Sequence, residues 1–287
     1  MILNISSSFY SLNRHNPTGF LPSLASFREL VDICRSLDCY FFCDEMYRNL
    51  EMDAERCLPS AVDMGYARAI ALCGVSKALS LPGLRIGWLV STSIDFLHRV
   101  TELHDYSEYG NLIAFVFSDK LLLMTYMICS ITWLPDSSFL CREIATICNS
   151  APSEVLALMA LRCRERILSR NRTIVEENLA LLRPFFQRQS ARFAWHEPIA
   201  GTVCFPRLLT PMARVQGAPG ETAAGAAAAP PPAEVNVTEY CKWLVETHGI
   251  MLLPSSVYDD FDVPCFRLGF GRNNMKAALE LWEATLQ

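Results

Sequence analysis

The sequence predicts an α/β fold built on a mostly parallel, buried sheet. Three short apolar runs have the length of buried strands, at residues 39–43, 69–73 and 85–90, and a segment with helical periodicity precedes the first of them. Apolar strands separated by helices are typical of parallel sheets that are covered on both faces. Ligands of such sheets bind outside the carboxyl ends of the strands, so the residues that follow these runs are candidate site residues.

The elements of the first half place two polar residues at strand ends. Ser26 and Glu29 form a capping-box pattern, which predicts a helix that begins there. Asp44 directly follows the first apolar run, and Lys77 follows the second after a short turn. Because the carboxyl ends of parallel strands meet at one edge of a sheet, we expect Asp44 and Lys77 to share a pocket. The apolar stripe of the helix is expected at Phe27, Leu30, Val31, Cys34 and Leu37.

The second half is more helical. Residues 154–189 predict one or two long helices, and Pro184 predicts a kink or break in them. Asn236 and Glu239 form another capping pattern, and Gly249 predicts the end of that helix. A strand at residues 266–270 and a terminal helix at 275–286 follow, and the helix is expected to bury Met275, Leu279, Trp282 and Leu286.

Composition argues against several classes of protein. The formal net charge is −5 and there is no lysine-rich block, so no basic face for nucleic acid is expected. The 12 cysteines include no C-x-x-C pair, which favours reduced thiols in a cytoplasmic protein over a disulfide framework. The N-terminal residues show no targeting pattern, and the five histidines lack metal-ligand spacing.

Two stretches depart from ordinary globular composition. Residues 112–134 are nearly apolar and long enough to cross a membrane. Asp119 and Lys120 interrupt this stretch, so a buried or irregular insert is the preferred interpretation and no membrane association is expected. Residues 211–233 consist mainly of Ala, Pro and Gly, and they predict a surface loop.

Four short motifs occur in one order along the chain. The intervals between their key residues are 28 residues from Asn16 to Asp44, 33 from there to Lys77, and 8 from there to Arg85. The motifs are Asn16-Pro17-Thr18-Gly19, Asp44-Glu45-Met46-Tyr47-Arg48, Ser76-Lys77 with the run Leu81–Trp88, and Phe266–Arg272. Together they resemble the class I/II aminotransferases, the fold-type I family that uses pyridoxal 5'-phosphate.

The resemblance implies a role for each residue that faces the ring of the cofactor. Lys77 is implied to form the Schiff base and to move a proton at the substrate Cα. Asp44 is implied to pair with the pyridine nitrogen and keep it protonated. Asn16 and Tyr47 are implied to bond the ring hydroxyl. Outside this pattern, Lys77 would be an ordinary turn lysine and Asp44 a capping residue.

The remaining implied roles concern anionic groups. Ser76 and Arg85 resemble the phosphate ligands of the family, and an arginine fork suits phosphate oxygens. Arg267 lies where the family places the arginine that binds the α-carboxylate of the substrate. Residues 146–154 and 201–207 resemble a helix start and a small-domain strand of the family, without an assigned role.

The resemblance also predicts the domain organisation and its departures from the family. It implies the PLP-transferase fold type I, with the remainder of a large domain at residues 12–165 and a smaller C-terminal α+β domain at 166–287. The part that precedes the first motif in the family, which cradles the phosphate, is expected to be truncated here. Gly74 stands where the family has a second hydroxyl. Residues 107–145 have no family counterpart, and we interpret them as translated intron sequence or a gene-model error, which sequencing of the transcript would test.

Two functional hypotheses follow from the resemblance. The first is amino-group transfer between an amino acid and a 2-oxo acid by a cytoplasmic homodimer, through the Schiff base at Lys77. The second is a truncated, inactive remnant of the fold that acts as a binding protein. A lyase or cyclase of the same fold would use the same residues as the first.

Overall fold

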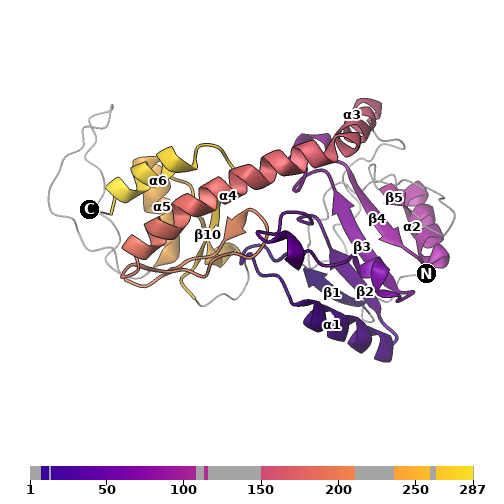
Figure 1. Ribbon diagram of the computed structural model, residues 1–287. Coiled ribbons are helices and arrows are strands. Elements are labelled where there is room, and N and C mark those ends of the chain that lie inside the picture. The colour runs from indigo at the N-terminus through magenta and orange to yellow at the C-terminus, as the bar shows by residue number, and fades with distance from the viewer. Residues whose placement is uncertain are drawn as a thin grey trace. The chain divides into compact units, whose positions relative to one another are not determined.

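The computed structural model describes residues 8–12, 14–107, 113–115, 150–210, 236–258 and 263–286. They form two compact units (Figure 1). The first unit comprises residues 1–14 and 20–171, and the second comprises 15–19 and 172–287. The boundary after Asn171 falls inside one long helix.

The first unit contains a five-stranded sheet in sequential order, as Figure 1 shows. All neighbouring strands are parallel except β3 and β4, which are antiparallel. The predicted α/β fold with a mostly parallel sheet is therefore confirmed. The strands are β1 (Ser8–Leu12), β2 (Tyr40–Asp44), β3 (Ala69–Gly74), β4 (Gly87–Ser91) and β5 (Ile113–Phe115).

Helices α1 (Leu24–Ser36) and α2 (Ile94–Ser107) cover opposite faces of this sheet. Alternate side chains of a strand point to opposite faces. Phe41 of β2 contacts Phe27 of α1 with ring centroids 5.6 Å apart, and the adjacent Tyr40 contacts Phe96 of α2 at the same distance.

The predicted start of α1 at Ser26 is wrong by one turn. Ser23 has extended backbone angles and its hydroxyl accepts a hydrogen bond from the Ser26 amide, so Ser23 is the N-cap. A serine three residues earlier thus provides the cap before the predicted box can begin the helix.

The long helical region divides at Cys163, not at Pro184. Helix α3 spans Ala151–Arg162, and α4 spans Arg164–Arg188 with Pro184 inside it. Of the two predicted effects of Pro184, the break is therefore wrong, and the kink stays a prediction. Phe185 and Phe186 are buried immediately after the proline, and this packing offsets the hydrogen bond that the ring removes.

The second unit packs helices against short antiparallel strands. Strands β7 (Val203–Cys204), β10 (Phe266–Gly269) and β9 (Leu253–Pro254) form one sheet in that order. Strands β6 (Phe193–Ala194) and β8 (Arg207–Leu208) form another.

Two helices complete the second unit, and both were predicted. Asn236 caps α5 (Val237–His248) and Gly249 ends it with a φ of 67°. Helix α6 (Met275–Ala284) buries Met275, Leu279 and Trp282 as expected, and Leu286 is buried two residues after the helix ends. Trp282 donates a hydrogen bond to the Tyr240 hydroxyl at 2.8 Å.

Several predictions concern residues outside the described ranges. The tract at 211–233 lies there, as does most of the region at 107–145. The described part of the apolar stretch, Ile113–Phe115, is the strand β5, which pairs with β4. Of the helices in the described ranges, none combines the length and the apolar composition that a membrane crossing needs.

Candidate functional site

Five of the seven predicted site residues belong to the first unit, and the sheet register places them at one edge. Asp44 ends β2 opposite Leu72 of the parallel neighbour β3. Strand β3 ends at Gly74, with Ser76 and Lys77 following. Strand β4 is antiparallel to β3 and pairs its first residue, Gly87, with Gly74, so Arg85 enters at the same edge. The register thus places Asp44 and Lys77 at one edge of the sheet, and the common pocket expected for them stays a prediction.

The segment after Asp44 contacts the turn that carries Lys77. The half-buried Asp44 carboxylate accepts a hydrogen bond from the Met46 amide at 2.9 Å. The Met46 carbonyl in turn accepts one from the Ala78 amide at 3.3 Å. The exposed Lys77 amine lies 5.8 Å from the centroid of the Tyr47 ring. These contacts link the segment of Asp44 and Tyr47 to the turn of Lys77, and they place the amine near the Tyr47 ring.

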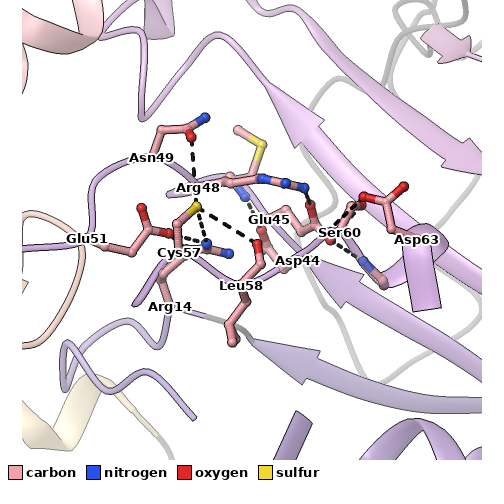
Figure 2. A network of polar contacts seen from close by, with 12 residues as sticks. Arg14, Asp44, Glu45, Arg48, Asn49, Glu51, Cys57, Leu58, Ser60 and Asp63 are labelled. Atoms are coloured by element: carbon pink, nitrogen blue, oxygen red, sulfur yellow. Dashed lines mark hydrogen bonds and ion pairs between the residues drawn. The ribbon is translucent and has the colours of Figure 1, made fainter. Parts of the chain in front are cut away.

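The buried carboxylate of Glu45, next to Asp44, anchors this segment to the chain around Ser60 (Figure 2). Glu45 Oε1 accepts hydrogen bonds from the Ser60 hydroxyl at 2.9 Å and the Ala61 amide at 2.7 Å. Its Oε2 accepts one from Arg48 Nη1 at 3.0 Å. A buried carboxylate costs little only when several donors satisfy it, as they do here. Sequence analysis assigned Glu45 no role.

A second ion pair in Figure 2 anchors the following loop. The buried Arg14 guanidinium donates to the buried Glu51 carboxylate and lies 3.9 Å from Cys57 Sγ. Arg14 follows strand β1, so this pair connects the loop after Tyr47 to the chain that leaves the sheet.

The structure explains why glycine replaces the expected hydroxyl residue at position 74. A Cβ there would lie 2.9 Å from the Ile86 carbonyl oxygen and 2.9 Å from Met46 Cε. The tight pairing of β3 with β4 therefore excludes any side chain. The phosphate ligands predicted in this unit are reduced to Ser76 and Arg85. Arg85 has a φ of 57°, and its exposed side chain donates to the Pro82 carbonyl at 3.2 Å.

The other two predicted site residues, Asn16 and Arg267, meet in the second unit. Asn16 Oδ1 accepts a hydrogen bond from Arg267 Nη1 at 3.3 Å, although 251 residues separate them. The Arg267 guanidinium also lies 5.9 Å from the centroid of the Tyr258 ring. The Phe205 ring meets the Tyr258 ring edge-on at 5.8 Å. Burial raises the pKa of Tyr258, and the nearby guanidinium of Arg267 opposes that shift.

The turn that carries Asn16 is fixed by Gly19. The Gly19 amide donates to the His15 carbonyl at 2.8 Å, and the Gly19 carbonyl accepts from the amides of Ile199 and Ala200. With a φ of 69°, Gly19 packs so closely that a Cβ would lie 2.4 Å from Pro198 Cβ. The turn therefore requires glycine at this position.

Two buried asparagines of α4 support the chain next to predicted site residues. Asn171 Nδ2 donates to the Ala78 carbonyl at 2.9 Å in the first unit. Asn178 Nδ2 donates to the carbonyls of Phe270 and Arg272, both at 2.7 Å, in the second unit. Sequence analysis missed both, because polar residues at helical spacing give no sign of their distant partners.

Among the described residues, no cluster of three potential metal-ligand side chains occurs. The described cysteines are all free thiols, as predicted, and most of them are buried. Burial raises the pKa of Cys204 and of Cys241 to about 12 in each case, so both thiols stay protonated at neutral pH and are poor nucleophiles.

Comparison with known families decides the classification. The sequence profile of the family described as "Aminotransferase class I and II" matches residues 10–280. The chain belongs to this family. Members of the family use pyridoxal phosphate, and the fold is the fold type I that the motifs predicted.

Individual relatives match over shorter stretches. The arginine–pyruvate transaminase AruH of Pseudomonas aeruginosa is 32% identical over 76 residues, which is 26% of this chain and 19% of that protein. The cystine lyase CORI3 of Arabidopsis thaliana is 26% identical over 96 residues, covering 33% of this chain and 23% of the relative.

Solved structures of the family match nearly the whole chain. A PLP-dependent aminotransferase from Streptococcus suis superimposes with a TM-score of 0.67 and 23% identity, covering 96% of this chain and 56% of that one. The PLP-dependent cyclase OrfR has a TM-score of 0.69 and 20% identity, covering 98% of this chain and 58% of that one. The chain thus spans less than three fifths of the length of these proteins.

Proposed function

We propose that this chain binds pyridoxal phosphate through Lys77 and transfers an amino group between an amino acid and a 2-oxo acid. The observation that carries the proposal is the shared sheet edge of Asp44, Lys77 and Arg85, supported by membership of the aminotransferase family.

The residue types at this edge fit the cofactor. The edge offers a carboxylate for a ring nitrogen, an amine for an aldehyde, and a guanidinium with a hydroxyl for a phosphate. When bound, pyridoxal phosphate supplies the aldehyde and an electron-withdrawing ring that stabilises negative charge at the substrate Cα. The phosphate has the fewest ligands, since Gly74 has no room for a hydroxyl side chain.

Each residue of the chain has a distinct task under this proposal. Lys77 Nζ attaches the cofactor and moves the proton to and from the substrate Cα. The Asp44 carboxylate holds a proton on the ring nitrogen, and the Tyr47 hydroxyl donates to the ring oxygen. Ser76 and Arg85 bind the phosphate.

The second unit supplies the substrate contacts. Arg267 binds the α-carboxylate through its two-pronged guanidinium, which fixes the orientation of the Cα–H bond. Asn16 Oδ1 accepts one Arg267 N–H and so limits the rotation of the guanidinium. Its amide nitrogen is assigned to the ring oxygen of the cofactor.

Transfer assays with a panel of amino donors and 2-oxo acids test this proposal. The wild-type chain with added cofactor is expected to produce new amino acids. Lys77→Arg is expected to abolish that product, and Asp44→Asn is expected to reduce it greatly. Turnover by Lys77→Arg equal to wild type would contradict the role of the lysine. Release of ammonia in place of transfer would assign the chain to the lyases of the fold.

A second candidate function is cofactor binding without turnover. One observation favours it, namely that Gly74 leaves no room for a second hydroxyl side chain at the predicted phosphate ligands. Cofactor bound at Lys77 with no product from any donor would establish it.

The proposal of amino-group transfer also includes the homodimer and the cytoplasmic location that the family resemblance implies. Light scattering would test the homodimer, and cell fractionation would test the location.

A further inference from the structure

Ala78, the residue after Lys77, has both of its backbone polar groups held by other segments. Its amide donates to the Met46 carbonyl at 3.3 Å. Its carbonyl accepts the hydrogen bond from Asn171 Nδ2 at 2.9 Å. The first contact links the lysine turn to the segment of Asp44 and Tyr47, and the second links it to helix α4.

The position of Asn171 on α4 makes this bond structurally demanding. Leu168, three residues earlier and on the same face of the helix, is buried in a cluster with Val75, Ala78 and Leu79. Asn171 as a residue is only 6% exposed and lies beside this apolar contact. A buried amide without partners is costly, so the bond to the Ala78 carbonyl is strongly favoured.

The orientation of the Asn171 amide is determined by its other end. Asn171 Oδ1 accepts a hydrogen bond from Arg170 Nη1 at 3.2 Å. The oxygen is therefore engaged with a cation, and the nitrogen donates to an acceptor, the Ala78 carbonyl.

We propose that Asn171 is a positioning residue for Lys77, holding the backbone of the lysine turn so that the amine stays beside the Tyr47 ring. This inference rests on the proposed function, in which Lys77 attaches the cofactor. Asn171 touches neither cofactor nor substrate. It acts through the Ala78 carbonyl, and a group held from two sides presents its reactive atom in a narrower range of positions.

Two measurements on Asn171→Leu test the inference in the full chain. The first is hydrogen–deuterium exchange of the peptide that contains residues 75–81, without cofactor. Exchange is expected to rise about fivefold, the change in an opening equilibrium that loss of one ordinary hydrogen bond produces. The second is reductive labelling with pyridoxal phosphate and borohydride, followed by peptide mapping. The fraction of label on Lys77 relative to the exposed Lys242 and Lys276 is expected to fall by a similar factor.

Asn178→Leu is the matched control, since it removes the same buried amide two turns along the same helix. It is expected to raise exchange at residues 270–272 and to leave the label on Lys77 unchanged. Asn171→Gln keeps an amide at a longer reach and is expected to give intermediate exchange and labelling. It replaces the leucine variant if that variant does not fold.

The outcomes separate this inference from the proposed function. Unchanged exchange at residues 75–81 in the Asn171 variants would overturn the inference, as would an equal loss of Lys77 labelling in Asn178→Leu. Absence of label on Lys77 in the wild type would instead overturn the proposed function. In that case the exchange measurement alone still decides whether Asn171 holds the lysine turn.

Discussion

Replacement of Gly19 by alanine measures how strictly the turn that carries Asn16 is specified. Two penalties are expected. The first is the left-handed backbone, since Gly19 has a φ of 69°, and a Cβ in that region costs roughly 1–2 kcal/mol. The second is overpacking, since the new Cβ would lie 2.4 Å from Pro198 Cβ and 3.0 Å from the Val203 carbonyl oxygen. Forced insertion of a methyl group typically costs about 1–3 kcal/mol.

Gly249→Ala separates the two penalties. Gly249 has nearly the same φ, 67°, and a Cβ there would meet nothing within 4 Å. Both variants lose the same unfolded-state freedom, so that contribution cancels in the comparison. Gly19→Ala is expected to be less stable than Gly249→Ala by about 1–3 kcal/mol.

Urea unfolding followed by tryptophan fluorescence gives both free energies. The Gly19 variant is also expected to weaken substrate binding, because its turn holds Asn16 against Arg267. Equal stability of the two variants would show that the close contact with Pro198 does not exist, and the account of this turn would be refuted.

Three further predictions follow from other parts of the structure. Gly74→Ser restores the hydroxyl expected for the family, and it should lower the free energy of unfolding by about 1–3 kcal/mol without improving cofactor affinity. The control Gly83→Ser adds its side chain in open space and should be neutral. Tighter cofactor binding by Gly74→Ser would contradict the steric explanation. Glu45→Gln should lower the free energy of unfolding by about 1–3 kcal/mol, because three donors lose their carboxylate partner. Urea unfolding measures this change, and a neutral result would show that the network does not support the site. Burial lowers the pKa of His15 below its ordinary value of 6.5. The folded state therefore favours the neutral imidazole, and the free energy of unfolding should fall as the pH drops below 6.5. His15→Gln should flatten that part of the pH–stability curve, and an unchanged curve would rule out the contribution of His15.

The sequence was sufficient for the parts of the fold and site that depend on local patterns. Apolar runs located the strands, and the residues after them, Asp44 and Lys77, meet at one edge because of sheet topology. Asn236 and Gly249 bounded α5 by capping chemistry that involves only near neighbours.

Features that depend on distant partners could not be predicted. Asn171 bonds a carbonyl 93 residues away, and its sequence neighbourhood is an ordinary polar helix. Glu45 is satisfied by a loop 15 residues further on, which gives no sequence signal. Pro184 misled for the same reason, since aromatic packing in the second unit decides whether the helix continues. The glycine at position 74 became understandable only when the Ile86 carbonyl and Met46 were seen beside it.

The attachment of cofactor to one lysine is the most direct test of the central claim. The sequence contains four lysines, Lys77, Lys120, Lys242 and Lys276, so borohydride reduction in the presence of pyridoxal phosphate and peptide mapping can account for every one. The pyridoxyl group is expected on Lys77 in the wild type, and the amount of this label is expected to fall when Asp44 is replaced by Asn. Label spread evenly over the lysines, or confined to any lysine other than Lys77, would contradict it.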